Sequence, residues 1–242
     1  MTVADEITDI WVSLAASPQL WLTMTLVVFL FSVWLNRRLG GNPALHPVLL
    51  SMGLLIAILL LTGTDYDTYF EGAQFVHFLL GPATVALAIP LYDYRHQIRA
   101  WLAPLLVAGI TGAAVAALSA VAVGAALGGE STSLMSLAPK SVTTPIAMGV
   151  AEKLGGLPSL TAALVLMTGS LGCIMAPGII RLLGIRDDAV KGFAMGLTAH
   201  GLGTAQAFSI SAKAGAFAGL GLSLAGLITA LMLPLLIGFL PV

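Results

Sequence analysis

Charged residues are scarce in this sequence. Asp, Glu, Lys and Arg make up 9% of its 242 residues, whereas a soluble domain carries about 25%. Hydrophobic residues account for 58%. Such a chain could not cover itself with polar surface in water, but in a lipid bilayer an apolar surface is what the hydrocarbon solvent requires. The composition therefore excludes a water-soluble globule and predicts a polytopic membrane protein.

Cysteine and clustered basic residues are also lacking. Cys173 is the only cysteine, which excludes an intrachain disulfide and a thiolate metal cluster and favours a small buried side chain. The net charge is -1 and the Lys and Arg residues are scattered, so no nucleic-acid surface is expected. Because the sequence holds no catalytic triad, carboxylate pair or metal-ligand cluster, we expect neither an enzyme nor a bound cofactor or metal ion.

The N-terminal residues are acidic where a signal peptide would be basic. Asp5, Glu6 and Asp9 precede the first apolar run, and no small-residue cleavage site follows it. We therefore expect the first helix to be retained. The predicted organisation is an N-terminal extracytoplasmic or interfacial segment, residues 1–17, followed by a single transmembrane domain, residues 18–242.

Five stretches of the sequence are long enough to cross a bilayer, which takes about 20 apolar residues in a helix. They contain no Asp, Glu, Lys or Arg and comprise Pro18 to Leu35, Ala44 to Gly63, Trp101 to Leu127, Leu157 to Ile180 and Ala214 to Val242. Three further apolar segments are interrupted by proline or glycine: Val76 to Leu91, Thr132 to Ala151 and Gly192 to Ala212. The sequence thus predicts an all-α fold with about seven or eight hydrophobic segments.

Lys and Arg in the connecting loops predict the orientation, because cytoplasmic loops are enriched in both. Arg37 and Arg38 follow the first span, so the N-terminus is expected outside the cell. If every segment crosses, six basic residues lie inside and three outside. If Thr132–Ala151 and Gly192–Ala212 each enter and leave on one side, Lys153 alone lies outside and eight lie inside. The eight are Arg37, Arg38, Arg95, Arg99, Arg181, Arg186, Lys191 and Lys213. The charges favour two opposed segments that are re-entrant or broken.

Two of the proline-containing segments form a faint internal repeat. Leu80–Val85 and Leu137–Val142 share Leu, Pro and Val in register, and each has a hydroxyl residue, Thr84 or Ser141, two positions after the proline. Chance similarity in a sequence rich in Ala, Leu and Pro explains the match equally well. Transporters built from repeats bind their substrates where discontinuous helices meet, so these segments are where we expect a binding site.

Lys140 stands in the middle of its apolar segment, where an ammonium costs about 2.5–3.5 kcal/mol to insert. Ser141, Thr143 and Thr144 add hydroxyl groups beside it, and the flanking prolines interrupt the helix and free backbone groups. A cation, hydroxyl donors and free amides together suit a small carboxylate anion. The alternative is a lysine that extends to the membrane surface from a shallow hairpin.

The second candidate site is the run from His200 to Gln206 in the other interrupted segment. Gly201 and Gly203 allow an unwound turn or a close backbone approach, and His200 and Thr204 add donors and acceptors. Tight helix packing is the alternative explanation for the glycines. For His200, a structural hydrogen bond to a neighbouring helix is nearly as good an explanation as a substrate contact.

Three runs of residues carry a family resemblance: Leu79–Leu91, Ala138–Ala147 and His200–Ala205. They resemble the LrgB/CidB family of bacterial membrane proteins, and the Pro-Lys-Ser-Val-Thr-Thr-Pro order of the middle run is the most distinctive. The resemblance extends over essentially the whole chain and reaches the C-terminal part of the plant plastidic glycolate/glycerate translocator. It implies a multi-pass protein of the bacterial cytoplasmic (inner) membrane.

The resemblance implies two functions of different class. One is secondary transport of small monocarboxylates such as glycolate, glycerate or pyruvate, by alternating access and with a smaller LrgA/CidA-like membrane protein as partner. The other is an antiholin-like modulation of murein hydrolase export and cell lysis. A lysine in the apolar middle of a segment suits anion binding, so transport is favoured. A homodimer is the default assembly, because two-fold oligomers are the commonest.

Carried over to this sequence, the resemblance assigns the carboxylate to two groups of residues and a weaker third contributor. The first group is Lys140, Ser141, Thr143 and Thr144, the second is His200, Gly201, Gly203 and Thr204, and the third contributor is Thr84. The sequence departs from the family at Gln206, where a basic residue is common. No second cation is therefore expected to neutralise the substrate at that position.

Overall fold

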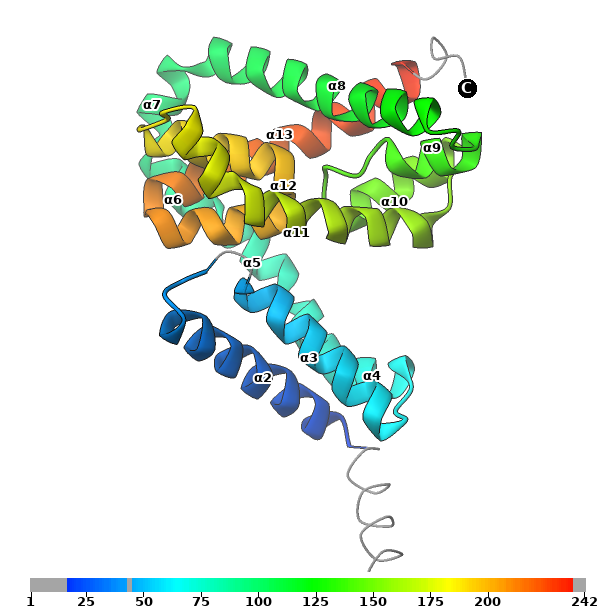
Figure 1. Cartoon of the computed structure of the whole chain (residues 1–242). Coiled ribbons are helices and arrows are strands. Elements are labelled where there is room, and N and C mark those ends of the chain that lie inside the picture. Colours follow the sequence, from blue (N-terminus) through cyan, green and yellow to red (C-terminus); the bar gives the residue numbers. More distant parts are fainter. Residues whose placement is uncertain (1–16, 43–44, 237–242) are drawn as a thin grey trace, which may run out of the picture. The chain divides into compact units, whose positions relative to one another are not determined.

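Figure 1 presents the computed structural model of the chain, which describes residues 17–42 and 45–236. The regular elements among these residues are helices, which confirms the predicted all-α fold. Residues 1–16 of the predicted N-terminal segment lie outside the described residues. The helices form two compact units, one ending at Ala86 and one beginning at Leu87, and each unit is described by itself.

The N-terminal unit contains α2 (Pro18–Arg38), α3 (Pro47–Thr62), α4 (Tyr66–Phe78) and α5 (Leu80–Ala86). Trp21 of α2 is fully buried, because α4 presents Gly72 where a Cβ atom would collide with the Trp21 side chain and the Pro18 carbonyl. The ring of Tyr69 meets the Trp21 ring edge-on, with centroids 5.9 Å apart. These contacts fix α2 against α4.

Asp65 begins α4 as its N-cap. Its carboxylate accepts a hydrogen bond of 2.9 Å from the backbone N–H of Thr68. This bond, with a second one from the Thr68 hydroxyl, lowers the pKa of Asp65 because both favour the ionised carboxylate. Asp65, in the loop between α3 and α4, thus defines where α4 begins.

The C-terminal unit carries the interrupted segments between long helices. In chain order it contains α6 (Ala88–Asp93), α7 (Arg95–Ala100), α8 (Leu102–Ala126), α9 (Ser131–Leu137), α10 (Thr144–Lys153), α11 (Pro158–Leu182), α12 (Asp188–Ile210) and α13 (Ala212–Leu236). The three longest helices have 25 residues each, which is enough to cross the hydrocarbon layer.

Within the described residues, 5 helical stretches are long and apolar enough to cross a membrane: Pro18–Arg38, Tyr66–Asp93, Leu102–Ala126, Pro158–Leu182 and Ala212–Leu235. The shorter α3 is also apolar. Four of the predicted spans are therefore confirmed as long helices over their described residues, and the fifth is the shorter α3. The interrupted segment Val76–Leu91 is contained in Tyr66–Asp93. The protein is a multi-pass membrane protein, as its composition predicts.

The segment Thr132–Ala151 folds into a helical hairpin, here named the first hairpin and comprising α9, the turn 138–143 and α10. Side chains of both arms, such as Leu134 on α9 and Val150 on α10, belong to one buried cluster. After α10, the backbone N–H of Leu157 donates to the hydroxyl of Ser136 near the C-terminal end of α9, at 2.7 Å. The chain that follows α10 therefore returns alongside α9.

The segment Gly192–Ala212 forms a second hairpin within α12. The backbone is non-helical at Ala199 and His200. A straight helix of this length would separate its ends by about 35 Å, yet the Asp188 carboxylate accepts a hydrogen bond of 2.9 Å from the hydroxyl of Ser211. The second hairpin, as named from here on, has a first arm, residues 188–199, and a return arm, residues 201–210.

The two hairpins approach from opposite ends of the unit. The first hairpin leads into the start of α11 and the second follows its end, and α11 is about 37 Å long at 1.5 Å per residue. Their tips meet in a shared core, because Val142 of the first turn, Leu197 of the first arm of the second hairpin and Val165 of α11 belong to one buried cluster. Figure 1 shows α10, α11 and α12 gathered in this region. The two opposed interrupted segments that the loop charges favour are thus present.

The predicted repeat between Leu80–Val85 and Leu137–Val142 does not correspond to a shared conformation. The first segment lies in helix α5, whereas the second ends α9 and forms the following turn. The structural counterpart of the first hairpin is the second hairpin. Each lies between two long helices and is broken by residues that do not sustain a helix, Pro139 in one and His200 in the other.

Candidate functional site

Lys140 lies at the tip of the first hairpin, in the turn between α9 and α10. Its ammonium donates a hydrogen bond of 3.2 Å to the hydroxyl of Ser141. The flanking residues Pro139 and Val142 are fully buried, and Ser141 is nearly so. The turn residues therefore hold the lysine stem among packed side chains, with one neutral oxygen as its partner.

No carboxylate lies within ion-pair distance of Lys140 in the described part of the chain, where the ion pairs join Lys191 to Asp188 and Lys213 to Asp187. Lys140 is partly buried, and a cation withdrawn from water is normally paired, because its desolvation without a counter-charge is costly. The hydroxyl of Ser141 carries a dipole and no full charge. The first tip therefore has an uncompensated positive charge.

The helix that follows the turn adds hydrogen-bond donors at the same tip. Thr143 is the N-cap of α10 and its side chain makes no capping hydrogen bond, and Pro145 occupies the first turn. Amide groups in the first turn have no acceptor within a helix, and the helix dipole places partial positive charge there. The hydroxyls of Thr143 and Thr144 are partly exposed at this end. These features are able to bind an anion.

His200 forms the tip of the second hairpin in a strained conformation. Its φ of 42° and ψ of -128° lie in a region that non-glycine residues rarely adopt. The ring Nε2–H donates a hydrogen bond of 3.0 Å to the carbonyl of Val165 on α11, and the side chain is buried. The Thr204 hydroxyl donates to the His200 carbonyl at 2.9 Å. The structural hydrogen bond that the sequence left as an alternative for His200 is therefore present.

The two glycines beside His200 have different surroundings. Gly203 lies where the arms of the second hairpin touch, and a Cβ there would collide with the carbonyl of Met195. Its small size is needed for packing. Gly201 is exposed, and a Cβ there would have no atom within 4 Å. Gly201 begins the return arm, and the first-turn amides of a helix have no acceptor within it.

Thr84 belongs to α5 of the N-terminal unit. Its side chain lies outside the described residues, so its assignment stays a prediction. The other predicted site residues lie at or beside the tips of the two hairpins of the C-terminal unit. The assignment of all nine residues to a substrate site remains a prediction.

Several residues that the sequence did not indicate support the two tips. Gly169 leaves room for His200, since a Cβ on Gly169 would lie 2.7 Å from the imidazole Cε1. On the first hairpin, Ser136 accepts from the amide of Leu157, and its carbonyl accepts from the hydroxyl of Thr161 at 3.0 Å. Hydroxyl residues and glycines within apolar helices were the available signal, but the sequence does not show what they face.

Gln206 has a role that differs from neutralising an anion. Its side-chain Nε2 donates to the carbonyl of Cys173 at 3.1 Å. His200 donates to the carbonyl of Val165, which lies earlier on the same helix, α11. Val165 and Cys173 are about 12 Å apart along α11. A two- or three-carbon acid at the tip of the second hairpin would therefore not reach Gln206.

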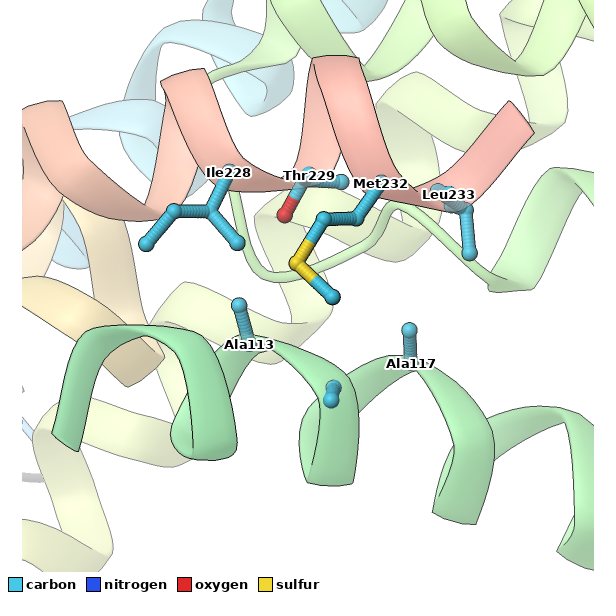
Figure 2. Close-up of a pocket in the computed structure, with 7 residues that line it drawn as sticks. Ala113, Ala117, Ile228, Thr229, Met232 and Leu233 are labelled. Carbon is cyan, nitrogen blue, oxygen red and sulfur yellow. The ribbon is translucent and has the colours of Figure 1, made fainter. Parts of the chain in front are cut away.

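Two hollows of the C-terminal unit are apolar. A groove of about 470 Å³ lies between α8, the first arm of the second hairpin and α13, with Trp101, Phe193 and Phe217 among its lining residues. Figure 2 shows a second hollow where Ala113 and Ala117 of α8 face Met232 of α13. Its volume of about 10 Å³ is too small to hold a substrate. Neither hollow offers a charged partner to a carboxylate.

Comparison with known proteins gives the family. The family model described as the LrgB-like family matches residues 25–239, which include both hairpins. The chain belongs to the LrgB-like family. This confirms the resemblance that the sequence carries.

Proteins of Bacillus and Staphylococcus align over most of the chain. The uncharacterized protein YwbG of Bacillus subtilis is 35% identical over 80% of this chain and 86% of its own length. YxaC of the same organism is 34% identical over 88% of this chain and 93% of its own length. The holin-like protein CidB of Staphylococcus aureus is 28% identical over 90% of this chain and 95% of its own length. No solved structure matches the chain.

Proposed function

We propose that this LrgB-like protein is a secondary transporter of small monocarboxylates of the glycolate, glycerate and pyruvate class. The observation that carries the proposal is the unpaired ammonium of Lys140 at the tip of the first hairpin. A partly buried cation in an apolar segment without a counter-charge is unfavourable for stability, so its presence is explained best by a counter-charge that arrives from solution. A carboxylate supplies that charge.

The surroundings of the two tips support a small substrate. Ser141, Thr143 and Thr144 offer hydroxyls to carboxylate and hydroxyl oxygens, and the helices that begin at Thr144 and Gly201 offer first-turn amides. Two opposed broken segments that share one core are the usual site architecture of secondary transporters. Alternating access then requires that one or both hairpins move relative to the surrounding helices.

The second candidate function is an antiholin-like modulation of murein hydrolase export and cell lysis. The observation in its favour is that several relatives carry the name holin-like protein CidB. A protein that acts through helix association needs complementary packing faces and gains nothing from an unpaired cation at a hairpin tip. Transport is therefore the preferred function, and altered carboxylate traffic could itself change the cell envelope.

The proposal places the protein in the bacterial cytoplasmic (inner) membrane with its N-terminus outside, because the basic loops then lie inside. An LrgA/CidA-like small membrane protein and a second copy of the chain are the proposed partners. No enzymatic step is required.

The test is uptake of labelled pyruvate, glycolate and glycerate by purified protein in liposomes under an imposed pH gradient. We expect saturable uptake by the wild type. Lys140→Ala should weaken apparent affinity at least about 30-fold, because losing one partner of a buried charge pair costs about 2–5 kcal/mol. Lys153→Ala is the matched control, since Lys153 is an exposed lysine at the end of the same hairpin.

Equal uptake by Lys140→Ala and wild type would show that Lys140 does not bind the substrate. No uptake of any of the three acids by folded protein, with an LrgA/CidA-like partner also reconstituted, would refute the transport function and favour the lysis-modulating one.

A further inference from the structure

The second hairpin is joined to α13 by close backbone packing. Cβ atoms on Gly192 and Gly196 would collide with the carbonyls of Ala214 and Ala218 on α13. At its base, the Asp187 carboxylate binds Lys213 in the first turn of α13 at 3.3 Å, and the Asp188 carboxylate binds Ser211 just before α13 at 2.9 Å. Backbone surfaces at this distance do not separate without a large loss of packing. The second hairpin and α13 therefore form one body.

The hairpin is joined to α11 in a different way. In the described residues, the hydrogen bonds between α12 and α11 come from two side chains, His200 to the Val165 carbonyl and Gln206 to the Cys173 carbonyl. Side-chain bonds of this kind can break and re-form as a rotamer changes, while both backbones stay intact. Gly169 and Gly172 of α11 also pack closely on this hairpin, but the atoms that they face first are side-chain atoms and not backbone carbonyls. The interface with α11 is therefore the less firmly joined of the two.

Pro177 explains why the Cys173 carbonyl accepts a bond from another helix. In a regular helix this carbonyl would accept from the N–H four residues later, but that residue is Pro177, which has no N–H. Gln206 supplies the missing donor. The other end of the same amide, Oε1, is buried and has no hydrogen-bond partner. The Gln206 amide is thus only half satisfied while its Nε2 is bonded to α11.

We propose that Gln206 is a positioning residue whose releasable bond to the Cys173 carbonyl, freed by Pro177, holds the return arm of the second hairpin against α11. Opening lets Oε1 gain a partner while Nε2 loses one, so the two states of the amide are closely balanced. His200 and the tip would swing with the same arm. This inference rests on the proposed transport function for its biological role, but its structural content does not need a substrate.

The chain provides its own reporter for this motion. Cys173 is the only cysteine and is 1% exposed, at the position where Gln206 bonds to α11. Its thiol should react with N-ethylmaleimide only when the interface opens, so the labelling rate follows the open population. The experiment uses the full-length wild-type protein in liposomes, with labelling followed by intact-mass spectrometry.

Gln206→Met keeps the length of the side chain but removes the donor, and Gln97→Met on α7 is the matched control outside this interface. We expect Cys173 in Gln206→Met to label about two- to tenfold faster than in wild type, the factor that corresponds to one net hydrogen bond. Gln97→Met should label at the wild-type rate. Wild-type labelling of Gln206→Met would overturn the proposal.

Pro177→Ala tests the cause, because residue 177 then supplies the helical N–H to the Cys173 carbonyl. We expect Pro177→Ala to label faster than wild type, and Pro177→Ala combined with Gln206→Met to label no faster than Pro177→Ala alone. Independent, multiplying effects of the two substitutions would show that Gln206 does not act through this carbonyl.

Saturating glycolate, glycerate or pyruvate separates this inference from the proposed function. If one of these acids binds at the hairpin tips, it should slow the labelling of wild-type Cys173. If none does and no uptake is found, the transport function fails, while the difference between Gln206→Met and Gln97→Met still decides whether Gln206 holds the hairpin.

Discussion

Replacing Gly169 with alanine tests whether the tip of the second hairpin is packed on α11. A Cβ at Gly169 would lie 2.7 Å from the Cε1 atom and 2.8 Å from the Nε2 atom of His200. Carbon atoms in contact are normally 3.5–4.0 Å apart, so the imidazole would have to move by about 1 Å. Its hydrogen bond to the Val165 carbonyl, now 3.0 Å, would then exceed hydrogen-bond distance.

Two costs add up at this position. Overpacking a dense core costs about 1–3 kcal/mol, and the lost hydrogen bond contributes about 0.5–1.5 kcal/mol more. We therefore expect Gly169→Ala to reduce the free energy of unfolding by about 1.5–4.5 kcal/mol. The transport proposal adds that uptake should also fall, because the tip would be displaced from the first hairpin.

Gly178→Ala is the matched control on the same helix. A Cβ at Gly178 would have no atom within 4 Å, so alanine should change the free energy of unfolding by less than about 1 kcal/mol, in the stabilising direction. Both variants can be compared by denaturant titration in mixed micelles, followed by tryptophan fluorescence. If Gly169→Ala is as stable as Gly178→Ala, the packing of His200 against α11 is refuted and so is its role in positioning the tip.

Two further predictions concern the ends of the hairpins. Ser136→Ala should destabilise the protein by about 0.5–1.5 kcal/mol, because it removes the acceptor of the Leu157 amide. Ser170→Ala should have little effect on the same titration, and equal effects of the two substitutions would contradict the link between α9 and α11. At the base of the second hairpin, desolvation raises the pKa of Asp187, but the Ala189 amide and Lys213 outweigh it and hold the pKa below its ordinary value. The stabilisation from the Asp187 carboxylate is therefore present above its ordinary pKa and lost as the pH falls through its lowered pKa. The free energy of unfolding of Asp187→Asn should depend less steeply on acid pH than that of wild type. An unchanged pH profile would refute the contribution of Asp187 to stability.

The sequence alone determined the class of the protein and the location of its unusual segments. Low charge and long apolar runs require a bilayer, because the solvent decides which surface a chain can expose. Proline, glycine and an isolated lysine mark the two segments that do not continue as helices, and these are properties of single residues and their neighbours. Loop charges favoured opposed segments, and the order of residues from Pro139 to Pro145 was enough to indicate the family.

The tertiary structure decided how the segments reverse and what each residue contacts. Reversal depends on long-range contacts such as Asp188 with Ser211, which lie 23 residues apart and leave no local pattern. Leu80–Val85 and Leu137–Val142 are similar in residue order, but they differ in conformation. The fold instead pairs the first hairpin with the second, because both lie between long helices. It also left Gln206 as a departure from the family. Only the packing of α11 against the return arm shows that Gln206 replaces the donor that Pro177 lacks. A carbonyl left without its helical N–H needs another donor, and the fold decides which side chain is close enough to supply it.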